Sequence, residues 1–147
     1  MADPMRVELV SPERVLFSGE ATQVVTRVLG SGEIAFLPGH APYLGALTEN
    51  HTRVWLTDGT VLDVAVHGGF VQVSNNTVSI LSDVAELGHQ VDRQRAHEAK
   101  LRAEDELGKA VADDGAELEA KAALARAQAR LNASGGIPAG SAGNLTN

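Results

Sequence analysis

Four arginines after residue 90 are spaced so that they could bind a polyphosphate. Arg95 and Arg102 lie seven residues apart, which is about two helical turns, and Arg126 and Arg130 lie four apart, about one turn. If two such helices fold back on each other, four planar guanidinium groups converge, and their bidentate donors suit phosphate oxygens. The simpler interpretation is ordinary surface charge, with Glu98 and Arg102 as an i,i+4 pair and Arg126 solvated.

Histidine is the other residue type that could do chemistry. The sequence has five, and no two have the His-x-His or His-x-x-x-His spacing of metal ligands: His40, His51, His67, His89 and His97. Neither a Gly-x-Ser-x-Gly motif nor a phosphate-binding loop is present. Lone serines and histidines do not make a catalytic triad. We therefore predict no metal site and no catalytic residues.

Residues 32–47 form the most unusual stretch, because a short apolar run there ends in a proline-rich loop. Pro38, Gly39 and Pro42 lie within five positions, so the loop must be rigid. His40 lies in this loop between two apolar stretches, an unusual place for an imidazole unless the loop contacts a partner. The alternative is that His40 only hydrogen-bonds its own loop.

The composition excludes several classes of protein. The 147 residues suffice for one domain or one domain with an appendage. Because cysteine is absent, disulfides and thiolate metal sites are excluded. A net charge of −7 and an aromatic content of 3% argue against nucleic-acid binding. No apolar run approaches the roughly 20 residues of a membrane span, so we expect a soluble protein that reaches a membrane only through a partner.

Residues 1–87 read as short strands separated by turns, which predicts an antiparallel β-sandwich. Asp58-Gly59 lies between two apolar runs and predicts a tight hairpin turn in which both residues have positive φ. Asn75-Asn76 separates a second pair of runs. In residues 67–69, His-Gly-Gly, the two glycines have no Cβ atom, which predicts a bulge or a close approach of two backbones.

Residues 88–133 predict an α-helical hairpin, so that the fold class is α+β. Asp92 is well placed to cap the first helix, and small apolar residues follow at helical spacing, including Ala96, Ala103, Leu118 and Ala129. Since the apolar stripe is mainly alanine, the hairpin buries little surface and can separate. Residues 134–147 are rich in Gly, Ala, Ser and Asn, which predicts a disordered tail.

Three segments resemble one known family. Residues 32–42, Gly-Glu-Ile-Ala-Phe-Leu-Pro-Gly-His-Ala-Pro, resemble the signature loop of the epsilon subunit of the rotary proton-translocating ATP synthase. Phe17-Ser18-Gly19 and the runs 67–73 and 78–86 agree in order and spacing, so the resemblance covers about residues 5–132. Two positions depart from the family pattern: Ala35 stands where glycine is usual, and His67 stands where a small hydroxyl residue is common.

The resemblance implies a bacterial central-stalk subunit without an active site of its own. The sandwich would bind the gamma subunit and the membrane-embedded c-ring, and its c-ring contact would include Glu33, Pro38, His40 and Pro42. The subunit would couple c-ring rotation to gamma and restrain wasteful ATP hydrolysis through its helices. It would be peripheral on the cytoplasmic face of the plasma membrane, held there only by the complex.

Residues 91–96 also resemble the nucleotide-binding motif of some bacterial epsilon subunits, with Val91 in place of the usual Ile or Leu. No cofactor is required, but the resemblance implies a regulatory ATP site formed by Glu86, Val91, Asp92, Arg95, Ala96, Arg102, Arg126 and Arg130. When ATP is scarce, the helices would open along gamma, and Lys121, Arg126 and Arg130 would meet acidic loops of the catalytic beta subunits. The alternative function is a stand-alone β-sandwich enzyme or ligand-binding protein with a helical oligomerisation arm.

Overall fold

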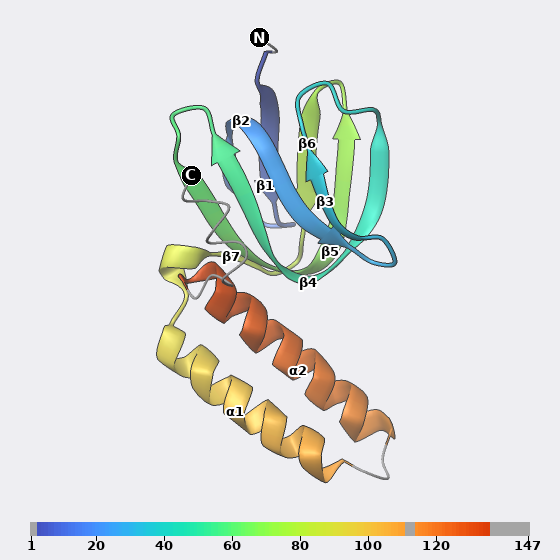
Figure 1. Ribbon diagram of the computed structural model, residues 1–147, viewed down its shortest axis with the longest axis vertical. Coiled ribbons are helices and arrows are strands. Elements are labelled where there is room, and N and C mark those ends of the chain that lie inside the picture. The colour runs from blue at the N-terminus through green and yellow to red at the C-terminus, as the bar shows by residue number, and fades with distance from the viewer. Residues whose placement is uncertain (1–2, 111–113, 136–147) are drawn as a thin grey trace.

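The computed structural model describes residues 3–110 and 114–135, which form a β-domain followed by two antiparallel helices (Figure 1). Within these residues seven strands are present: β1 (Met5–Val10), β2 (Val15–Val28), β3 (Gly32–Phe36), β4 (Tyr43–Leu56), β5 (Val61–Ser74), β6 (Thr77–Leu81) and β7 (Ala85–Leu87). A short 3-10 helix, η1 (Gly88–Gln90), leads into α1 (Arg93–Lys109), and α2 (Asp114–Ala133) returns toward the β-domain. The predicted α+β fold class is confirmed.

The described strands close into a ring. Its order is β1, β6, β5, β4, β2 and back to β1, while β3 pairs with β2 and β7 pairs with β5. In a ring of five strands the directions cannot alternate all the way round, so one neighbouring pair must be parallel. That pair is β1 and β6. The predicted sandwich is correct in form, and the parallel pair follows from closing an odd number of strands.

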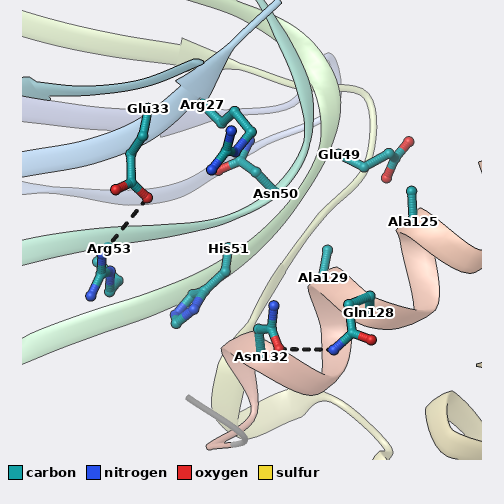
Figure 2. Close-up of a pocket in the computed structure, with 10 residues that line it drawn as sticks. All are labelled: Arg27, Glu33, Glu49, Asn50, His51, Arg53, Ala125, Gln128, Ala129 and Asn132. Carbon is teal, nitrogen blue, oxygen red and sulfur yellow. Dashed lines mark hydrogen bonds and ion pairs between the residues drawn. The ribbon is translucent and has the colours of Figure 1, made fainter. Parts of the chain in front are cut away.

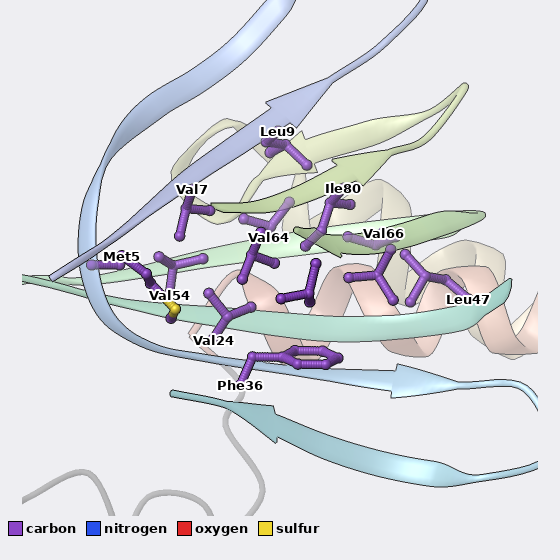
Figure 3. Close-up of a cluster of buried hydrophobic side chains, with 14 of the residues drawn as sticks. Met5, Val7, Leu9, Val24, Phe36, Leu47, Val54, Val64, Val66 and Ile80 are labelled. Carbon is purple, nitrogen blue, oxygen red and sulfur yellow. The ribbon is translucent and has the colours of Figure 1, made fainter. Parts of the chain in front are cut away.

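Alternate side chains of the strands point into the ring and build the core (Figure 3). Val24 of β2, Phe36 of β3 and Val64 and Val66 of β5 are fully buried. Each such side chain contributes about 1.5–3 kcal/mol relative to an exposed one. The residues of this core cluster all come from strands, so the β-domain has a hydrophobic core that does not depend on the helices.

The turn between β4 and β5 differs from the prediction. Only Gly59 has a positive φ (91°), and Asp58 does not. The amide of Leu56 donates to the carbonyl oxygen of Thr60 at 2.8 Å, so the loop is one residue longer than the tight two-residue turn. The carboxylate of Asp58 accepts a hydrogen bond from the Thr60 amide at 2.8 Å, which holds this longer turn.

The turn between β5 and β6 is the one with two positive φ angles. Asn75 and Asn76 have φ of 51° and 57° and lie between the paired residues Ser74 and Thr77. Asparagine tolerates this left-handed region better than most residues do. The two-residue turn geometry is therefore present in the sheet, but at a different hairpin from the one predicted.

The predicted close approach at the paired glycines of β5 is confirmed. Gly69 has a φ of 109°, and a Cβ built there would lie 2.0 Å from the carbonyl oxygen of Leu81. On one side of the glycines β5 pairs with β7, and on the other side it pairs with β6. Glycine lets the strand change partners at this point without a steric clash.

The two helices pack in sequence onto the β-domain: α1 lies against α2, and α2 lies against β4 and β5 (Figure 1). Asp92 caps α1, as predicted, by accepting a hydrogen bond from the amide of Arg95 at 3.1 Å. Leu118 is not part of the buried stripe, because 69% of its surface is exposed. Ala120 and Ala127 are buried instead. The apolar periodicity of α2 gave a wrong prediction at Leu118 because this helix is covered on two sides, by α1 on one and by the sheet on the other.

The chain between the two helices differs from the prediction. The sequence predicts an acidic turn at Asp113-Asp114-Gly115, but α2 begins at Asp114, so the last two of these residues are helical, and residue 113 lies outside the described ranges. The expected disordered tail, 134–147, is described only at Ser134 and Gly135. Those two residues form a turn after α2.

Candidate functional site

A surface cavity of about 360 Å³ lies where α1, α2 and β7 meet. It is lined by Glu86, Asp92, Arg95, Ala96, Ala99, Arg102 and Arg130, and we call it the arginine cavity. Six of these seven residues belong to the set predicted to bind nucleotide. Folding of the hairpin therefore brings together residues that lie up to 44 positions apart in the sequence.

Three guanidinium groups and two carboxylates face the arginine cavity, so its formal charge is positive. Arg95 and Arg102 come from one face of α1, as their spacing predicted, and Arg130 comes from α2. Ala96 and Ala99 also line the cavity, and their small side chains leave room for a ligand. Planar, bidentate donors arranged around an open hollow can bind a polyphosphate.

Two predicted residues do not line the cavity in the described structure. Val91 lies just outside it, where its amide donates to the carbonyl oxygen of Gly88 at 3.2 Å and closes η1. Arg126 is half-buried on α2, one turn before Arg130. Four arginines therefore do not converge in this state, and only three do.

Four ionisable side chains form a row that runs from the sheet to α2, and we call it the charge row. Glu49 Oε1 lies 2.6 Å from His67 Nδ1, and His67 Nε2 lies 2.9 Å from Glu86 Oε1. The same Glu86 oxygen accepts a hydrogen bond from Arg130 Nε at 2.5 Å. The row thus anchors α2 to β7 and fixes the position of one cavity arginine.

The pKa of Glu86 reflects these partners. Burial acts to raise it, but hydrogen bonds from Arg130 and His67, together with their positive charges, more than offset burial, so the pKa lies below its ordinary value. Glu86 is therefore ionised at neutral pH, and its carboxylate balances part of the positive charge in the arginine cavity.

A second contact holds the hairpin closed, and the sequence did not suggest it. Arg93 Nη1 donates to the carbonyl oxygen of Ser134 at 3.1 Å and to the Ser134 hydroxyl at 2.7 Å, with a longer bond to the carbonyl oxygen of Leu131 at 3.4 Å. A cation at a helix C-terminus satisfies exposed carbonyl groups and complements the helix dipole. The beginning of α1 is thereby tied to the end of α2.

A polar groove of about 430 Å³ lies on the other side of α2, against the outer face of the sheet (Figure 2). Its walls are Arg27, Glu33, Glu49, Asn50, His51 and Arg53 from the strands and Ala125, Gln128, Ala129 and Asn132 from α2. Arg53 is buried, its closest approach to Glu33 is 3.9 Å, and its Nε has no hydrogen-bond partner. The polar residues at the alternating positions 49, 51 and 53 are the feature of the sequence that indicates a polar outer face here.

The loop after β3 carries His40, and the imidazole forms part of its packing. Its ring lies edge-on to Phe36 with 4.8 Å between ring centres, and Nδ1 is 2.7 Å from the carbonyl oxygen of Ala41. The imidazole is half-buried, whereas the neighbouring Ala41 and Pro42 are exposed. The structure does not bring Glu33 and His40 together, because Glu33 begins β3 and lines the groove beside α2.

An exposed apolar patch covers the outer face of three neighbouring strands. Phe70 of β5 pairs with Leu81 of β6 and with Ala46 of β4, and Leu44 lies two residues before Ala46 on the same face. Leu44, Phe70 and Leu81 are exposed by 70%, 55% and 43%. Adjacent exposed apolar side chains of this kind are typical of a protein interface.

Metal and membrane features are absent from the part of the chain that the structure describes. Residues 3–110 and 114–135 contain no cluster of three or more side chains suited to hold a metal ion. None of the helices in these ranges has the length and apolar character required to cross a bilayer.

Comparisons with known families identify both parts of the chain. Residues 4–88 match the model of the ATP synthase delta/epsilon chain β-sandwich domain, and residues 90–135 match that of the delta/epsilon chain long α-helix domain.

Individual proteins agree with the family models. The ATP synthase epsilon chain of Streptomyces avermitilis is 42% identical over 126 residues, which are 86% of this chain and all of the relative. The epsilon chain of Corynebacterium efficiens is 49% identical over 110 residues, 74% of this chain and 87% of the relative. A chain in the cryo-EM structure of the Euglena gracilis mitochondrial ATP synthase superposes with a TM-score of 0.76 over 89% of this chain and 81% of its own length. Its identity is 19%, so this last likeness concerns the fold alone.

Proposed function

The chain belongs to the ATP synthase delta/epsilon family, whose epsilon chain is a non-catalytic subunit, and we propose that it couples c-ring rotation to gamma and restrains ATP hydrolysis through its hairpin. The observation that carries the regulatory part is the arginine cavity, which exists only while α2 lies folded against α1 and the sheet. The stand-alone enzyme considered as the alternative is not supported, because relatives over both domains are epsilon chains.

The ligand of the arginine cavity is ATP. Its polyphosphate takes the donors of Arg95, Arg102 and Arg130, which otherwise repel one another across the cavity. A ligand that binds only the folded hairpin stabilises it by RT ln(1 + [L]/Kd), or about 2.7 kcal/mol at a hundredfold excess over Kd. ATP thus favours the folded hairpin.

The hairpin is held weakly enough to be released. Its buried residues are largely alanines, among them Ala96, Ala103, Ala120 and Ala127. Burial of apolar surface contributes about 25 cal/mol per Å², and an alanine methyl group buries far less area than a leucine side chain. The polar contacts of Arg93 and Arg130 supply much of the remaining attachment. The free energy that holds the hairpin against the β-domain is therefore small enough for ATP binding to shift the balance between its folded and released states.

The released hairpin inhibits hydrolysis by contacting acidic loops of the beta subunits. Lys121 is exposed and is paired only locally, with Glu117 at 3.1 Å one turn earlier on α2. Arg130 leaves Glu86 when α2 moves, and Arg126 lies on the same helix. These cations are then available to carboxylates of another subunit.

The β-domain provides the permanent attachment. The apolar patch of Leu44, Phe70 and Leu81 docks on gamma, and its apolar character supports this choice of partner surface. The exposed loop after β3, with Pro38, Pro42 and His40, contacts the polar loops of the c-ring. Figure 1 shows this loop at the end of the β-domain away from the helices. Glu33, which was predicted to share this contact, lines the groove beside α2 instead, so we leave it out of the proposed c-ring surface. The subunit is thus peripheral on the cytoplasmic side of the membrane.

Calorimetry on the full chain tests the ATP site. Titration with ATP is expected to give saturable binding, and Arg102→Ala and Arg130→Ala are each expected to weaken it about tenfold or more, because each removes a charged hydrogen bond. Arg14→Ala, which removes an exposed arginine outside the cavity, is the matched control. No binding at millimolar ATP, or equal loss in the control, would refute the site.

A further inference from the structure

His67, the second member of the charge row, lies buried between two carboxylates. It is on β5, and only 3% of its side chain is exposed. Glu49, its register partner on β4, faces Nδ1 at 2.6 Å, and Glu86 on β7 faces Nε2 at 2.9 Å. Both ring nitrogens therefore face carboxylate oxygens at hydrogen-bonding distance.

This geometry fixes the protons on the ring. A neutral imidazole carries one N–H, so its other nitrogen would face a carboxylate with two lone pairs opposed. Only the imidazolium form donates from both nitrogens. With His67 protonated, the charge row alternates in sign from Glu49 to Arg130 and is neutral overall. Without that proton the row carries a net negative charge beside the arginine cavity.

Glu86 transmits this state to the cavity. Its Oε1 accepts from both His67 and Arg130 Nε, which leaves the two terminal nitrogens of Arg130 for a ligand. Two other ionisable pairs lie on this outer face and do not join the row: His51 with Asp63 at 2.7 Å, and Arg53 with Glu33 at 3.9 Å. The groups that face His67 are thus Glu49 from β4, Glu86 from β7 and, through Glu86, Arg130 from α2.

We propose that His67 is a positioning residue of the arginine cavity, and that its proton holds Glu86 and Arg130 in place and raises the affinity for polyphosphate. The inference rests on the proposed ATP site. Loss of the proton removes a positive charge from behind Glu86 and leaves Arg130 as the only cation of the row against two carboxylates. Glu86 then holds Arg130 more strongly, and the cavity becomes less attractive to an anion. ATP binding is accordingly weaker when the ring is neutral, so the affinity falls as the pH rises.

The test compares ATP affinity at about pH 6 and about pH 8 in the full chain, with His67→Gln as the variant and His89→Gln as the matched control, since His89 is exposed on η1. ATP itself gains a proton in this range, which changes its affinity for any cationic site. The curve of affinity against pH for His67→Gln measures this contribution and serves as the baseline. Relative to it, the wild type and the control are expected to bind about three- to tenfold more tightly at the lower pH and to converge with it at the higher pH. Parallel curves for wild type and His67→Gln would overturn the proposal.

Two further measurements keep the inference separate from the ATP site. Nitrogen chemical shifts of the His67 ring, recorded without nucleotide at about pH 6, are expected to show both nitrogens protonated, and a single protonated nitrogen would overturn the proposal even if ATP binds. If His67→Gln fails to fold, Glu49→Gln replaces it, since it removes one partner of the ring but keeps the side-chain volume. That variant is expected to move the pH midpoint of ATP affinity downward, and an unmoved midpoint would contradict the role of the row. Absence of ATP binding at every pH, with a doubly protonated ring, would refute the ATP site alone.

Discussion

Gly88 lies so close to the end of α2 that one added methyl group should open the joint between the β-domain and the hairpin. A Cβ at this position would be 2.2 Å from the carbonyl oxygen of Ala133 and 3.2 Å from the Cβ of Asp63. Neither atom is the end of a flexible side chain, so a backbone must move. Overpacking of this kind costs about 1–3 kcal/mol. Since the hairpin is attached by small side chains and a few polar contacts, this cost is a large part of its docking energy.

Hydrogen exchange followed by mass spectrometry measures the effect of Gly88→Ala segment by segment. Amides in the last turns of α2 should exchange about 5- to 100-fold faster, because the overpacking lowers the free energy of local opening by about 1–3 kcal/mol. The β-domain should be unchanged, since its core cluster consists of strand residues. Gly108→Ala is the matched control: a Cβ there meets nothing within 4 Å, and alanine should stabilise α1 by up to about 1 kcal/mol. Unchanged exchange in α2, or faster exchange throughout the β-domain, would refute the reasoning.

Three further predictions concern the β-domain, the charge row and the gamma interface. Gly69→Ala should destabilise the β-domain by about 3 kcal/mol or more, measured by thermal unfolding, because the Cβ would meet a backbone oxygen at 2.0 Å from a positive φ. The pKa of Glu86 is lowered in the folded state, so this carboxylate stabilises the docked hairpin fully above its ordinary pKa of 4.5, and that stabilisation is lost as the pH falls through the lower pKa of the folded state. Circular dichroism of the helices in acid should show this loss, and Glu86→Gln should abolish it. Phe70→Ser should weaken binding to gamma at least about tenfold in a pull-down titration, whereas Leu118→Ser, at a more exposed apolar position on α2, should not.

Local patterns predicted the parts of the structure that local physics decides. Asp92 caps α1 because its carboxylate reaches an amide three residues later, which the sequence shows directly. The spacing of Arg95 and Arg102 placed both on one helix face, and both line the arginine cavity. The two glycines of β5 marked a close backbone approach, because no other residue type tolerates one.

Features set by distant contacts could not be predicted in the same way. His67 meets Glu49 and Glu86, which are 18 and 19 residues away, and only the strand registers bring the three together. The exposure of Leu118 depends on which sides of α2 are covered, and periodicity gives one face but not two. Arg126 lies one turn from Arg130 yet outside the cavity, because the position of α2 relative to α1 selects which arginine faces it.

The central claim is that ATP favours the hairpin folded against the β-domain. Because the sequence contains no cysteine, two spin labels can be placed without background, one at Leu118 on α2 and one at Thr57 in the turn after β4, both of which are exposed. Distances between the labels are measured by pulsed electron resonance in the subunit bound to gamma, with and without ATP. With ATP we expect a single distance that matches the folded structure, and when ATP is removed we expect a second, longer population. An identical distance distribution in both conditions would contradict this claim.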